Sequence, residues 1–176
     1  MARPYQPSLL RLLHIPTALL VAALWLTGLV ILGVYDGRWF RLPADFGSVD
    51  WIDVHGSLGV PLVLLVALFV PYALSLGRAR LRQAGNLVPL LALLLSVGTG
   101  LLMREDEVRG GGVGGPIYSL HVSGWVVMGI AVLLHLGGVM RRGGIPLAAS
   151  MFRLDLRSGD RPSDWPSQLI RHFRRG

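Results

Sequence analysis

The chain has 176 residues, of which 52% are hydrophobic and only 15% charged, and its formal net charge is +7. A soluble domain of this length would carry more charge. The absence of cysteine excludes disulfides, cysteine-ligated iron–sulfur clusters and covalent c-type haem, so any metal would need His, Met, carboxylate or backbone ligands.

Four apolar segments contain no Asp, Glu, Lys or Arg: 12–34, 56–76, 87–103 and 117–140. Each is near the length of about 20 residues with which a helix spans a bilayer. We therefore predict an all-α membrane protein, a four-transmembrane-helix bundle formed by residues 1–142. Residues 143–176 are predicted to form a basic cytoplasmic tail that is partly helical near Trp165–Phe173.

The charges indicate the orientation. All seventeen cations are arginines, and thirteen of them lie before the first segment, between the second and third, or after the fourth. The other two loops hold four arginines and seven of the ten acids. This positive-inside pattern places both termini in the cytoplasm. It also favours contact between the tail and lipid headgroups over nucleic-acid binding.

The histidines in the four segments fall into two pairs by depth. In chain order, His14 is near the cytoplasmic surface and His55 near the outer one, while His121 and His135 share the last segment, fourteen residues apart. Fourteen helical steps of about 100° return the side chain to within roughly 40° of its starting direction, about 21 Å further along the axis. One helix face therefore presents an imidazole near each surface, next to His55 outside and His14 inside.

This arrangement predicts two non-covalent b haems, each with two axial histidines. The ligands of one haem approach from opposite faces of the porphyrin, so they should come from different helices, and a filled axial pair leaves no open position for oxygen chemistry. Ionisable groups inside membrane spans are by default functional. A single zinc or copper site for all four histidines is excluded by the separation of about 21 Å.

Other residues have candidate supporting roles. Gly28, fourteen residues after His14, reaches the depth of the outer pair and would leave room for a porphyrin; close helix packing is the alternative. Haem propionates are anions that bind to cations. The arginines available for this role are Arg11, Arg141 and Arg142 on the inner side, and Arg38, Arg41, Arg104 and Arg109 on the outer side.

The pattern of His14, His55 in HGSLG, and HVSGWVVMGIAVLLH from His121 to His135 resembles the bacterial di-haem cytochromes b. This family includes prokaryotic cytochrome b561 and the b subunits of formate dehydrogenases and nickel–iron hydrogenases. The resemblance covers about residues 8–142. It implies a haem between His55 and His121 outside, and another between His14 and His135 inside, in a multi-pass protein of the bacterial cytoplasmic (inner) membrane.

By resemblance, the expected function is electron transfer between a periplasmic redox partner and the quinone pool, as the cytochrome b subunit of a respiratory or redox complex. The partner would be a c-type cytochrome or the subunits of a dehydrogenase or hydrogenase. A quinone would lie near Gln83 and Asn86, beside the inner haem; alternatively, Asn86 caps the third helix. The sequence does not determine the oligomeric state, and a homo-oligomer is compatible with it.

Two other functions are compatible with the sequence. One is a self-contained quinol or superoxide oxidoreductase of the b561 type, which would be an enzyme in its own right. Against it, the chain has Phe69 and Pro71 where b561 proteins usually carry an arginine near the end of the second helix. The other is a haem-free membrane scaffold or transporter, although the spans contain no carboxylate for transport.

Overall fold

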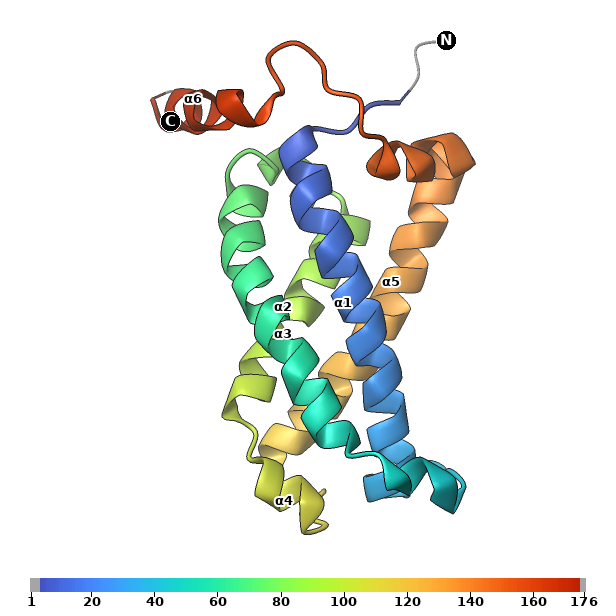
Figure 1. The fold of residues 1–176 in the computed structure, drawn as a ribbon. Coiled ribbons are helices and arrows are strands. Elements are labelled where there is room, and N and C mark those ends of the chain that lie inside the picture. Colours follow the sequence, from blue (N-terminus) through green and yellow to red (C-terminus); the bar gives the residue numbers. More distant parts are fainter. Residues whose placement is uncertain (1–3, 175–176) are drawn as a thin grey trace.

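The computed structural model describes residues 4–174, apart from the side chains of Ala44, Glu107, Leu169, His172 and Phe173. Within this range the regular structure is helical (Figure 1). Four helices are long and apolar enough to cross a membrane: α1 (Ser8–Ile31), α2 (Trp51–Leu74), α3 (Ala84–Leu102) and α5 (Pro116–Ala149). The predicted all-α, four-span bundle is therefore confirmed. The start of α1 and helix α6 lie at the same end of the bundle, and the arginine distribution predicts that this end faces the cytoplasm.

The long helices begin earlier than the apolar segments indicate, because polar residues form their first turns. The carboxylate of Asp50 caps α2 by accepting a hydrogen bond from the Asp53 amide at 3.2 Å. The first span is longer than α1 itself, because a π-helical turn (Leu32–Asp36) follows directly after Ile31. The last span also continues past 140, and it is interrupted only at Gly144, whose φ of 58° favours glycine.

Short elements complete the chain. They are the 3₁₀ turns Ala44–Ser48, Arg78–Arg82, Ser150–Phe152 and Pro162–Asp164, and the helices α4 (Glu105–Arg109) and α6 (Trp165–Phe173). The helix predicted in the tail is thus confirmed as α6. The sequence did not indicate α4, which is held on the start of α2 by ion pairs from Arg109 to Asp50 and Asp53.

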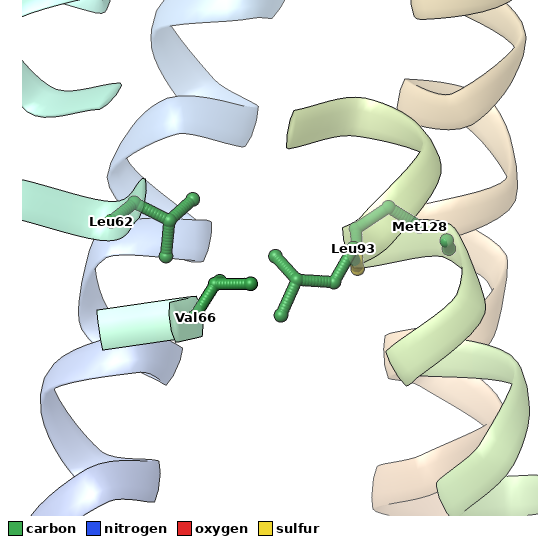
Figure 2. Packing of buried hydrophobic residues seen from close by; sticks show 5 residues of the cluster. Leu62, Val66, Leu93 and Met128 are labelled. Carbon is green, nitrogen blue, oxygen red and sulfur yellow. The ribbon is translucent and has the colours of Figure 1, made fainter. Parts of the chain in front are cut away.

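The bundle consists of two helix pairs that meet along a seam. Helix α1 packs along α2 and α3 along α5, whereas backbone approaches between the two pairs are few. At mid-depth an apolar layer crosses the seam: Leu62 and Val66 of α2 face Leu93 of α3 and Met128 of α5 (Figure 2). This layer separates the outer end of the bundle from the inner end.

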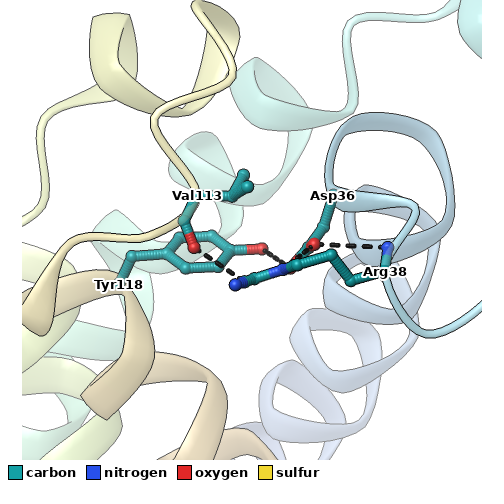
Figure 3. A network of polar contacts seen from close by, with 4 residues as sticks. All are labelled: Asp36, Arg38, Val113 and Tyr118. Atoms are coloured by element: carbon teal, nitrogen blue, oxygen red, sulfur yellow. Dashed lines mark hydrogen bonds and ion pairs between the residues drawn. The ribbon is translucent and has the colours of Figure 1, made fainter.

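At the outer end, a polar network also crosses the seam. The carboxylate of Asp36, with no exposed side-chain surface, accepts a hydrogen bond from the Tyr118 hydroxyl at 2.8 Å and pairs with Arg38 (Figure 3). The Arg38 guanidinium also donates to the Val113 carbonyl at 2.7 Å. The end of α1 is thereby tied to the start of α5, with every partner of the buried carboxylate supplied by the protein.

At the inner end, the tail folds back over the start of α1. Asp160 accepts a hydrogen bond from the Ser8 amide at 2.8 Å and thus caps a helix that has no capping side chain of its own. Trp165 donates to the Ser8 hydroxyl at 2.9 Å. The buried Arg11 guanidinium donates to the carbonyl oxygens of Arg153 and Asp155.

Candidate functional site

The four span histidines meet as two pairs, and each pair crosses the seam. His55 of α2 and His121 of α5 have ring centroids 6.2 Å apart, with the ring planes at 81°. His14 of α1 and His135 of α5 have centroids 6.1 Å apart, with the planes at 32°. Helix α5 therefore contributes one ring to each pair, and the other ring comes from a different helix each time.

These distances fit an iron held between two imidazoles. A metal–imidazole nitrogen bond is about 2 Å long and the ring centroid lies about 1.1 Å beyond the nitrogen, so two axial rings should have centroids about 6 Å apart. Rings that pack directly against each other have centroids about 4.5–7 Å apart, a range that also includes this spacing. In both pairs the spacing matches that of axial ligands.

The hydrogen bonds of three of the rings are made through Nδ1 and leave Nε2 free to bind a metal. His135 Nδ1 lies 2.9 Å from the Gly85 carbonyl oxygen, which can only accept, so Nδ1 carries the proton.

In the outer pair, Nδ1 faces a threonine hydroxyl: that of Thr27 at 2.8 Å from His55, and that of Thr99 at 3.0 Å from His121. Each hydroxyl has one proton and also contacts a backbone carbonyl of its own helix, Leu24 or Leu95, to which it donates. It can then accept from the histidine, and the Nε2 lone pair remains available for iron.

Small residues make room beside the outer pair. A cavity of about 280 Å³ is lined by both outer histidines and by Gly28, Gly59 and Gly100. A Cβ atom at Gly100 would lie 3.3 Å from His121, while Gly59 faces open space. At Gly28 a Cβ atom would lie 3.1 Å from the Trp125 indole and 3.7 Å from His55. Gly28 thus gives room to a tryptophan and a histidine, and its contact with a porphyrin stays a prediction.

Two tryptophans join α1 to α5 between the histidine pairs. The rings of Trp25 and Trp125 stack with centroids 4.8 Å apart and planes at 10°. Each indole donates to the backbone carbonyl of the other residue, at 3.2 Å from Trp25 and 2.9 Å from Trp125. Gly129 lies under Trp25 as Gly28 lies under Trp125. This reciprocal contact fixes where the two helices cross.

A model of the prokaryotic cytochrome b561 family matches residues 5–153, which include all four long helices. The chain belongs to this family. As a prokaryotic cytochrome b561 it is a multi-pass membrane protein that binds b haem and transfers electrons across the membrane. No curated protein and no solved structure matched the chain.

Several of the arginines predicted as propionate partners already bind protein groups in this cytochrome b561. Arg11 donates to tail carbonyls, Arg38 pairs with Asp36, and Arg109 pairs with Asp50 and Asp53. The arginines left for a propionate are Arg141 and Arg142 on the inner side and Arg41 and Arg104 on the outer side. None of these four forms an ion pair with a described carboxylate.

The residues predicted beside a quinone lie next to the inner pair. Helix α3 begins at Ala84 with Gln83 as its cap residue, so Asn86 lies inside the first turn and is not the cap. The Asn86 amide instead donates to the Arg80 carbonyl at 2.9 Å and closes the preceding turn. The Gln83 side chain is exposed, and Gly85 of the same turn holds His135 through its carbonyl.

Proposed function

We propose that His55 with His121, and His14 with His135, are the axial ligands of two b haems in this cytochrome b561. The observation that carries the proposal is the spacing of the two pairs, 6.2 and 6.1 Å between centroids, with each pair formed across the seam. When bound, a bis-histidine b haem supplies reversible one-electron transfer without an open site for oxygen. The chain holds the rings: Thr27, Thr99 and Gly85 fix Nδ1.

We further propose that the chain works in the bacterial inner membrane and connects a periplasmic redox partner with the quinone pool. The acidic outer loops, which include the run Glu105, Asp106 and Glu107, suit a basic partner such as a c-type cytochrome. On the inner side the Gln83–Asn86 turn is the proposed quinone contact, because it touches His135 through Gly85. A dehydrogenase or hydrogenase subunit could fill the partner's role on the outer side.

Haem counting in the purified chain tests the ligand assignment. We expect two b haems per chain by pyridine haemochrome, and one in His55→Ala or His121→Ala. The corresponding inner variants, His14→Ala and His135→Ala, should lose the other haem and keep the outer one. His172→Ala, a histidine of the tail outside the four spans, serves as the matched control and should keep two. A His121→Ala chain that retained two low-spin haems would refute the pairing.

A quinol-turnover assay addresses the alternative role. If the isolated chain oxidises quinol with a soluble acceptor, it is a self-contained oxidoreductase. If turnover appears only when a periplasmic partner is added, it is an electron-transfer subunit.

A further inference from the structure

The end of the last span and the residues just after it carry apolar side chains that the bundle does not cover. Beyond the break at Gly144, Ile145 is 72% exposed, Phe152 69% and Leu154 94%. The segment lies at the end of the bundle where α1 begins (Figure 1), where the arginine distribution places the cytoplasmic leaflet. Exposed apolar groups at this depth suit the boundary between headgroups and acyl chains.

A cavity of about 460 Å³ opens beside these residues. It is lined by Pro4, Tyr5, Arg153, Leu154, Asp155 and Arg157. Two arginines thus line one cavity together with a single acidic residue, Asp155. Neither arginine forms an ion pair with any carboxylate that the structure describes. The cavity therefore has excess positive charge and unused donors.

The cavity is held in shape by the folded-back tail. Arg157 stacks over the Tyr5 ring at 4.2 Å, and its backbone amide donates to the Tyr5 hydroxyl at 3.2 Å. Arg11 covers the same ring at 5.3 Å and binds the backbone of residues 153 and 155. The Arg153 and Arg157 guanidinium groups thus sit on a backbone that is anchored to α1 and not on a free tail.

We propose that this cavity binds the phosphate headgroup of an anionic phospholipid from the cytoplasmic leaflet. Arg153 and Arg157 would contact the phosphate, because guanidinium groups bind phosphate oxygens in a bidentate manner. Phe152 and Leu154, the neighbours of Arg153, would lie against the acyl chains. The combination of two unpaired arginines with adjacent exposed apolar side chains favours a lipid over a soluble anion, which would have no use for Leu154.

Lipid retention by the full-length haem protein tests the proposal. The protein is placed in mixed nanodiscs of phosphatidylglycerol and phosphatidylcholine, and the lipid that co-purifies after detergent transfer is measured by native mass spectrometry. An arginine near an anionic membrane surface contributes about fivefold in affinity, so the double variant Arg153→Gln/Arg157→Gln should bind phosphatidylglycerol roughly 30-fold less tightly. Leu154→Ser should weaken retention with both charges intact.

The matched control is Arg78→Gln/Arg82→Gln, which removes two exposed arginines from the other loop on the cytoplasmic side. It should retain the lipid like the parent chain, and an unchanged visible spectrum shows that both variants are folded. If both double variants lost phosphatidylglycerol to the same extent, the effect would come from net charge alone, and the proposed site would be overturned. Equal retention of phosphatidylcholine, or displacement of the lipid by millimolar inorganic phosphate, would overturn it as well.

Discussion

The stacked tryptophans provide the sharpest test of how the two halves of the bundle are held together. Replacing Trp25 with Leu removes a ring stack worth about 0.5–1.5 kcal/mol and a hydrogen bond worth about 1 kcal/mol. The leucine also leaves part of the space over Gly129 empty, and a truncated tryptophan can cost about 3–5 kcal/mol. We expect a loss of about 2–4 kcal/mol for Trp25→Leu, and a similar loss for Trp125→Leu.

The double variant separates the stack from the other contributions. Each indole donates to the backbone of the other residue, and a substitution of the partner side chain leaves that backbone acceptor in place. Each single variant loses the stack, so the sum of the two single losses counts it twice, whereas the double variant loses it once. The sum should therefore exceed the loss in the double variant by the stacking energy alone, about 0.5–1.5 kcal/mol. Unfolding in mixed detergent micelles, followed by circular dichroism, measures all four chains.

Trp39→Leu is the control for these tryptophan variants, because Trp39 is 65% exposed in the outer loop. This substitution should change the free energy of unfolding by no more than about 0.5 kcal/mol. If the double loss equals the sum of the single losses within about 0.3 kcal/mol, the rings are not coupled. The crossing of α1 and α5 would then be fixed elsewhere.

Three further predictions concern groups around the two sites and the tail. Thr99→Val removes the acceptor of the His121 Nδ1 proton, so the ring becomes a weaker donor to iron. Redox titration should then show the potential of the outer haem raised on the order of 50 mV and that of the inner haem unchanged. Tyr118→Phe removes one of the hydrogen bonds to buried Asp36 and should lower the free energy of unfolding by about 1 kcal/mol, measured by thermal denaturation. Burial acts to raise the pKa of Asp160, but hydrogen bonds from the N-terminal segment outweigh burial and hold the pKa below its usual value. The tail contact should therefore persist at neutral pH and be lost as the pH falls below about 4. Proteolysis of the tail measures this loss, and Asp160→Asn should be cleaved readily at every pH.

Much of the fold follows from the sequence because a membrane imposes simple rules. Apolar length gives the spans, arginine distribution gives the orientation, and helical rise gives the depth of each histidine. The fourteen-residue spacing of His121 and His135 was enough to predict that α5 carries one ring for the outer pair and one for the inner pair. Helix ends were predicted less well, since first turns such as Trp51–His55 are partly polar and lie outside the apolar segments.

The contacts that complete the sites depend on which face of each helix meets its neighbour. The spans are apolar on all sides, so periodicity does not distinguish a lipid-facing leucine from a buried one. Thr27 and Thr99 therefore gave no signal beyond being small polar residues in apolar segments, and the partnership of Trp25 with Trp125 had none. The tail contact was also not predicted, because Asp160 caps a helix more than 150 residues earlier in the chain.

The seam explains why the paired histidines belong to different halves of the bundle. Helices α1 and α2 pack together, as do α3 and α5, and the links between the halves within the membrane-spanning part are the apolar layer around Leu93 and the indole stack. At the two ends of the bundle the network around Asp36, the ion pairs of Arg109 with the start of α2, and the contacts of the tail with α1 add further links. A group bound between His55 and His121, or between His14 and His135, adds a link between the halves at each depth. Because ligand binding stabilises the state that binds it, a chain produced under haem limitation should unfold at a lower temperature, and hydrogen exchange should increase most along the faces of α1 and α5 that meet at the seam. Exchange that increased evenly over all four helices would instead mean that each helix pair depends on haem for its own stability, and that the seam is not the weak point of the fold.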